Sequence, residues 1–138
     1  MATLHKQILI EAPCAEVWDA VRDVGALHTR LVPGFVVDTQ LERDAAGKDV
    51  VARRVTFGNG VTLREPILSL DDERLRLAWT AEGGNTTHYN AVLEVTAEGS
   101  ATRVRWTSDF LPDEAGAVLS AMQDQGLATM RKTLEARR

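Results

Sequence analysis

The sequence predicts an α+β fold in which a curved, seven-stranded antiparallel sheet wraps around one long C-terminal helix. Residues 4–10 alternate between polar and apolar side chains and end in β-branched residues, as a strand does. A period of two recurs through residues 35–110, interrupted by turns. Residues 112–138 instead carry one apolar stripe at helical spacing. We expect a single domain over residues 1–138, in the order strand, two short helices, six strands and a long helix.

The two short helices are expected between the first strand and the second. Pro13 suits a first helical turn, because proline lacks only an N–H that the turn does not need. Val17, Trp18 and Val21 follow at helical spacing, and Trp18 should pack this helix under the sheet. A second helical piece over residues 24–34 should end at Pro33 and Gly34.

The remaining strands should form a meander whose register can be predicted from cross-strand pairs. The expected strands are 35–43, 49–57, 61–70, 74–80, 88–96 and 102–110. Pairing Val95 with Val104 makes one face almost wholly apolar and places Glu94 beside Arg105 on the other, and a one-residue slip loses both features. The further inward pairs are Leu93–Trp106, Ala91–Ser108 and Tyr89–Phe110, and in strand 74–80 the inward residues are Leu75, Leu77 and Trp79.

The hairpin RRVTFGNGVTLRE, residues 53–65, places two charges on the apolar face. A three-residue loop with Gly60 in the left-handed conformation pairs Arg53 with Glu65, and also Val55 with Leu63 and Phe57 with Val61. A two-residue Asn59–Gly60 turn would pair Arg54 with Glu65 and mix the faces. The three-residue loop keeps the apolar side chains together and is the favoured interpretation.

An inward Arg53 and Glu65 allow two interpretations. Ionised groups in a dry core cost several kcal/mol each unless they are paired and hydrogen-bonded. The interior beside them can be a cavity that holds water or the polar end of a ligand. Alternatively, the two side chains form a half-exposed ion pair at the rim of the sheet. The sequence leaves both interpretations open.

The C-terminal helix should begin at Pro112, Asp113 and Glu114, because proline and then acidic residues suit a helix N-terminus. Its apolar stripe comprises Ala115, Val118, Leu119, Met122, Gly126, Met130 and Leu134. Gly126 either leaves room for a ligand beneath the helix or packs closely against a bulky residue such as Trp79.

Composition narrows the possible partners. The net charge of −4 and pI of about 5.4 argue against nucleic acid or an anionic membrane as the main partner. The single cysteine, Cys14, permits no intramolecular disulfide, so we expect a cytoplasmic protein. We also expect a monomer or a weak homodimer. The N-terminal stretch has no long apolar run, so neither a signal peptide nor a membrane span is expected. We expect no cofactor.

Few residues offer chemistry. His5, His28 and His88 lack metal-ligand spacing, so no metal site is expected. We expect His28 to face solvent and His88 to lie at the rim of the sheet. Cys14, in a first helical turn where the thiol pKa can be lowered, is taken as structural or incidental. No catalytic residue can be assigned.

Three segments together resemble the SRPBCC superfamily, which includes START-like and birch-pollen-allergen-like proteins, and in particular its bacterial polyketide cyclase/dehydrase-like branch. IEAPCAEVWDAVRD (10–23) is similar to the family's strand-into-helix opening. The segment 53–79, RRVTFGNGVTLREPILSLDDERLRLAW, resembles its central hairpins. HYNAVLEVTAEGSATRVRWTSDFLPDE (88–114) resembles its last hairpin and helix entry.

The resemblance implies a helix-grip fold with a hydrophobic cavity between the sheet and the long helix. A small hydrophobic ligand with a polar or acidic end would bind there, with Arg53 and Glu65 as anchors, as a basic and an acidic side chain act in plant hormone receptors of this fold. The other expected ligand-binding residues are Val55, Phe57, Leu63, Leu77, Trp79, Tyr89, Ala91, Trp106, Ser108, Met122, Gly126 and Met130.

Two alternative functions remain open. The first is a cyclase/dehydratase enzyme of the lyase type, in which Tyr89, His88, Arg53 or Glu65 moves protons on a polyketide-like substrate. Because arginine stays protonated at physiological pH, Arg53 suits an anchor better than a proton donor. The second is a protein-interaction module, like the Hsp90-activator relatives in this superfamily.

Overall fold

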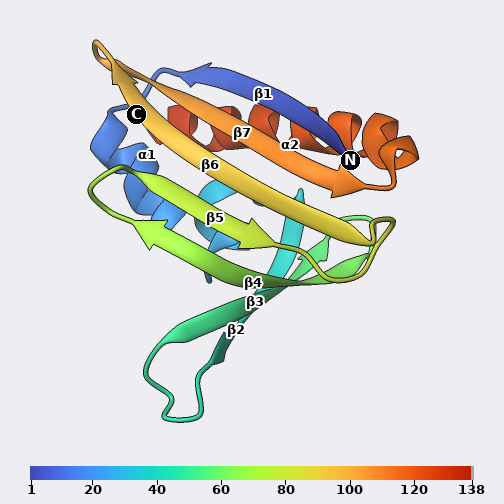
Figure 1. Ribbon diagram of the computed structural model, residues 1–138. Helices are drawn as coiled ribbons and strands as arrows, with labels where there is room; N and C mark the ends of the chain where they lie inside the picture. The colour runs from blue at the N-terminus through green and yellow to red at the C-terminus, as the bar shows by residue number, and fades with distance from the viewer. Residues whose placement is uncertain (138) are drawn as a thin grey trace.

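The protein has the predicted order of elements in the computed structural model, which describes residues 1–137. Figure 1 shows a curved sheet with a long helix across it. The elements are β1 (Ala2–Ile10), α1 (Cys14–Arg22), the π-helical turn η1 (Leu27–Leu31), β2 (Val36–Arg43), β3 (Val50–Phe57), β4 (Thr62–Asp71), β5 (Arg76–Thr80), β6 (His88–Glu98), β7 (Ala101–Leu111), the 3₁₀ turn η2 (Asp113–Ala115) and α2 (Gly116–Ala136).

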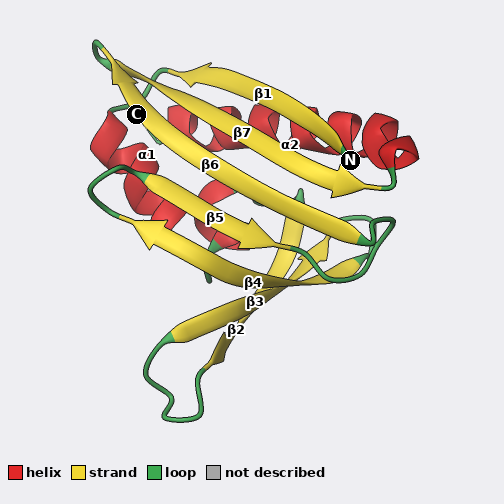
Figure 2. Ribbon diagram, in the orientation of Figure 1, coloured by secondary structure: helices red, strands yellow, loops and turns green. Residues whose placement is uncertain are grey.

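The seven strands form one antiparallel sheet in the order β1-β7-β6-β5-β4-β3-β2. The last strand, β7, therefore pairs with the first, β1, and β1 and β2 are the two edges of the sheet. Helix α2 runs behind β1, β7 and β6, while the β2–β3 hairpin turns away from the rest of the sheet (Figures 1 and 2).

The predicted register is confirmed in both hairpins that the sequence specified. In β6–β7, Val95 lies opposite Val104 and Glu94 opposite Arg105. In β3–β4, Arg53 lies opposite Glu65. Gly60 has φ +90°, in the left-handed region, and the Phe57 N–H donates to the Val61 carbonyl at 2.8 Å. The three-residue loop is therefore present, and the two-residue alternative is wrong.

Three details of the prediction were wrong. Strand β5 begins at Arg76, because Leu75 has φ +53° and belongs to the preceding turn. In that turn the Asp71 carboxylate accepts from the N–H groups of Glu73 and Arg74. The second helical piece is confined to the five residues of η1. Val118 was placed on the buried stripe of α2 but is 58% exposed, and Gln123 is fully buried there instead.

Trp18 is buried under the sheet, as predicted, and its indole N–H donates to Asp72 Oδ1 at 2.9 Å. The same carboxylate accepts from Arg22 Nε at 2.8 Å, and these contacts lower the pKa of Asp72, Arg22 more than Trp18. Asp72 thus links α1 to the β4–β5 turn.

The turn at 58–60 packs against the segment before β2. The Gly58 N–H donates to the Phe35 carbonyl at 2.9 Å, and a Cβ at Gly58 would lie 2.6 Å from the Gly34 carbonyl oxygen. Because that oxygen belongs to the backbone, it cannot move aside cheaply.

We therefore expect Gly58→Ala to lower the free energy of unfolding by about 1–3 kcal/mol, through overpacking. Gly116→Ala is the matched control, because its Cβ would meet Phe110 at an ordinary 3.5 Å in a helical conformation. Chemical denaturation of both variants measures the difference. Equal stabilities would contradict this account of the turn.

Candidate functional site

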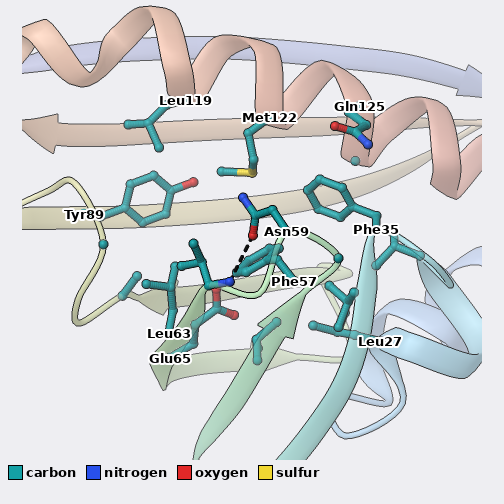
Figure 3. A pocket seen from close by; sticks show the side chains of 18 of the residues that line it. Leu27, Phe35, Phe57, Asn59, Leu63, Glu65, Tyr89, Leu119, Met122 and Gln125 are labelled. Atoms are coloured by element: carbon teal, nitrogen blue, oxygen red, sulfur yellow. Dashed lines mark hydrogen bonds between the residues drawn. The ribbon is translucent and has the colours of Figure 1, made fainter.

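A cavity of about 590 Å³ lies between the inner face of the sheet and α2. Its deep wall is formed by buried side chains from η1 and the residue after it, from β2 to β7, and from α2 (Figure 3). These wall residues are Leu27, Leu31, Val32, Val36, Arg53, Val55, Glu65, Trp79, Tyr89, Leu93, Trp106, Gly126 and Met130. All but Arg53, Glu65 and the Tyr89 hydroxyl present mainly apolar surface.

The lining residues that are exposed mark the mouth of the cavity. They come from the segment before β2, from the 58–61 turn, from the loop between β5 and β6, and from the first half of α2: Gly34, Gly58, Asn59, Val61, Gly83, Gly84, Asn85, Val118, Ala121 and Gln125. Asn59 lies across this mouth, with its Oδ1 accepting from the Val61 N–H at 3.0 Å and its side chain directed toward Met122 (Figure 3).

Arg53 and Glu65 form a buried ion pair in the cavity wall. Arg53 Nε donates to Glu65 Oε1 at 2.9 Å, and their side chains are only 3% and 8% exposed. Arg53 Nη1 also donates to the Val24 carbonyl at 3.4 Å, and the guanidinium carbon lies 5.3 Å from the centre of the Trp79 ring. The half-exposed rim pair is therefore wrong: both charges face the cavity.

Burial raises the pKa of Glu65, and the charge and hydrogen bond of Arg53 oppose that rise. Desolvation disfavours the carboxylate, while the guanidinium stabilises it. Glu65 Oε2 has no hydrogen-bond partner among residues 1–137, and both residues line the cavity. The pair thus offers the cavity one free carboxylate oxygen.

A polar cluster stands on another part of the wall. Gln123 Nε2 donates to the Tyr89 hydroxyl oxygen at 3.1 Å and to Ser108 Oγ at 2.8 Å. Burial raises the pKa of Tyr89 to about 12, although its contacts with Trp106, Gln123 and Ser108 lower it in part. With this raised pKa, the Tyr89 hydroxyl keeps its proton at neutral pH, while its oxygen accepts from Gln123.

Comparison with known proteins identifies the family. The family model described as polyketide cyclase/dehydrase and lipid transport matches residues 1–135. The chain belongs to this family. No curated protein matches the chain.

Solved structures of this family's helix-grip fold superpose over nearly the whole chain. A protein from Thermobifida fusca is 29% identical, with a TM-score of 0.77 over 99% of this chain and 93% of its own. XoxI from Bacillus cereus is 18% identical, with a TM-score of 0.83 over 97% of this chain and 96% of its own. BexL, a di-domain ARO/CYC of the BE-7585A biosynthetic pathway, is 19% identical, with a TM-score of 0.78 over 98% of this chain and 47% of its own.

Most residues expected to bind a ligand line the cavity of this family member, and three do not. The lining set is Arg53, Glu65, Val55, Phe57, Leu63, Trp79, Tyr89, Trp106, Met122, Gly126 and Met130. Leu77, Ala91 and Ser108 share the inner face but are at most 1% exposed and lie outside the lining. Ser108 is bonded to Gln123, and Ala91 lies opposite Ser108 in the sheet.

Gly126 fits both of its interpretations in part. It lines the cavity, and a Cβ there would lie 3.2 Å from the rings of Phe35 and Trp106. Close packing is therefore real, but against these two rings and not against Trp79.

Sequence reasoning missed Phe35, Asn59, Gln123 and Gln125. Gln123 had a detectable signal, because it lies four residues after Leu119 and four before Leu127 on the buried face of a helix. The mouth residues had none, since their segments meet only when the sheet curves.

The remaining candidates lie away from the cavity. His28 is half-buried, with Nδ1 3.2 Å from Thr39 Oγ1, so its predicted solvent-facing position was wrong. His88 is half-buried at the start of β6 and outside the lining. Burial raises the pKa of the Cys14 thiol, whereas a position in a first helical turn tends to lower a thiol pKa.

Within residues 1–137, no cluster of His, Cys, Asp and Glu could hold a metal ion. None of the described helices is long and apolar enough to cross a membrane.

Breaking the ion pair should destabilise the protein strongly. Arg53→Met leaves Glu65 buried without its partner, and we expect the free energy of unfolding to fall by about 3–5 kcal/mol. The double variant Arg53→Met/Glu65→Met should recover most of that loss, because neither charge remains.

Arg54→Met is the matched control, because Arg54 pairs with Glu42 on the outer face and is 54% exposed. It should change stability little. Urea denaturation of the four proteins is the measurement. A double variant as unstable as Arg53→Met would show that packing, and not the unpaired charge, sets the loss.

Proposed function

We propose that this protein binds a small, largely hydrophobic molecule with one polar end inside the cavity. The observation that supports it is a cavity with apolar walls into which a buried Arg53–Glu65 pair projects. Apolar walls with a few fixed polar groups are typical of ligand sites, and about 590 Å³ lies within their usual range.

The mouth supports the same proposal. Glycines 83 and 84 both have positive φ and line the mouth, where a Cβ on either would lie 3.4 Å or less from Leu63. Apolar side chains that are exposed there, Val61 and Val118, would contact an entering molecule. An apolar ligand gains about 25 cal/mol per Å² of apolar surface that it buries.

A cyclase/dehydrase activity in the same cavity is the second candidate. One observation favours it: Glu65, with its raised pKa and free Oε2, can exchange a proton with a bound substrate. Tyr89 supports it less, because a pKa of about 12 keeps its proton in place.

Deuterium exchange at the methyl group of bound 2-acetylnaphthalene in D₂O, followed by NMR, tests proton transfer. If the unmodified protein and the Glu65→Gln variant exchanged the methyl protons at the same rate, a proton-transfer role for Glu65 would be contradicted.

Blocking the mouth tests the binding proposal. Ala121→Trp places an indole at the entrance from an exposed lining position of α2. We expect it to weaken binding of N-phenyl-1-naphthylamine, a neutral probe whose fluorescence rises in apolar surroundings, by at least about ten-fold, which corresponds to about 1.4 kcal/mol.

Ala128→Trp is the matched control, because Ala128 is exposed on the same helix but lies outside the lining. It should bind the probe as the unmodified protein does. Thermal denaturation checks that both variants remain folded. No saturable binding to the unmodified protein, or equal binding by the two variants, would contradict a ligand-binding cavity.

A further inference from the structure

We infer that the ligand's polar end is an uncharged oxygen, such as a ketone or hydroxyl, and that Glu65 excludes carboxylates from the cavity. This inference rests on the proposed ligand-binding function and narrows its ligand class. It departs from the sequence-based expectation of a possible acidic end anchored by Arg53. The charge balance in the cavity wall carries the argument.

The positive charge of Arg53 already has partners. Its Nε donates to Glu65 Oε1 at 2.9 Å, its Nη1 contacts the Val24 carbonyl at 3.4 Å, and its guanidinium carbon is 5.3 Å from the centre of the Trp79 ring. Carboxylate, carbonyl and aromatic face all interact favourably with a cation. Arg53 therefore differs from an anion anchor that waits unpaired for its ligand.

A ligand carboxylate would add a second negative charge beside Glu65. Both would share one guanidinium in a wall whose charged side chains are only 3% and 8% exposed. Like charges in a poorly solvated site repel strongly, and water there can screen them little. The anion could enter only if Glu65 took up a proton or the ion pair broke.

An uncharged oxygen meets no such repulsion. Arg53 Nη2 has no hydrogen-bond partner within residues 1–137, so a ketone oxygen can accept from it. A ligand hydroxyl can in addition donate to the free Glu65 Oε2. Arg53, Glu65 and Tyr89 all line the same cavity.

Three probes of nearly equal shape test this selectivity: 2-acetylnaphthalene, 2-naphthoate and 2-ethylnaphthalene. Calorimetry on the unmodified protein should give 2-acetylnaphthalene the highest affinity. We expect 2-naphthoate to bind about ten- to a hundred-fold more weakly than 2-acetylnaphthalene, which corresponds to about 1.4–2.8 kcal/mol of binding free energy. Titration in two buffers of different ionisation enthalpy reports any proton taken up on binding.

Glu65→Gln should reverse the preference. The amide keeps the shape of the carboxyl group but leaves Arg53 with an unbalanced charge, so 2-naphthoate should become the tighter ligand and should raise the melting temperature. Glu42→Gln is the matched control, because Glu42 also pairs with arginines but lies outside the cavity lining. It should keep the preference of the unmodified protein.

The outcomes separate the inference from the function on which it rests. Naphthoate binding to the unmodified protein as tightly as 2-acetylnaphthalene, with or without proton uptake, would overturn the exclusion by Glu65. If a folded Glu65→Gln variant still bound 2-acetylnaphthalene more tightly than 2-naphthoate, the exclusion by Glu65 would be overturned as well. If Glu65→Gln does not fold, the comparison of the three probes on the unmodified protein still decides. Binding of none of the probes would overturn the proposed function itself.

Discussion

The buried ion pair between Arg53 and Glu65 is the interaction on which the cavity wall depends. It joins β3 to β4 across the hairpin, reaches the loop after α1 through the Val24 carbonyl, and stacks near Trp79 of β5. Because neither charge is tolerated there alone, the register of the hairpin and the turn at Gly60 are both tied to this pair. The pair fixes the shape of the wall and, at the same time, its charge.

The Gln123 cluster on α2 is the second polar feature, and it is incompletely paired. Gln123 Oε1 is buried without a hydrogen-bond partner among the described residues. Such a group costs about 1–3 kcal/mol relative to a satisfied one. The cluster fixes the Tyr89 hydroxyl, which an apolar residue at position 123 could not do. Stability alone therefore gives no reason for a glutamine at the centre of the helix stripe.

Local pairing was predictable from the sequence, and long-range convergence was not. The Val95–Val104 and Arg53–Glu65 registers follow from alternation and turn geometry, which act over a few residues. The start of β5 was missed because Leu75 takes a left-handed conformation that its side chain does not favour. The mouth was missed because residues near 34, 59, 84 and 121 meet only through the curvature of the whole sheet.

A dry core would need no ion pair at these positions. Replacing a buried pair by apolar residues of similar volume is often neutral or stabilising by about 1–4 kcal/mol. Arg53 and Glu65 thus carry a desolvation cost that hydrophobic packing would avoid, in a wall that is otherwise apolar. The same geometry gives the cavity an ion pair with no net charge, in which Glu65 Oε2 is free, and the Tyr89 hydroxyl lines the same cavity. The proposed recognition of an uncharged polar group inside an apolar space would account for that cost, which hydrophobic packing alone gives no reason to carry.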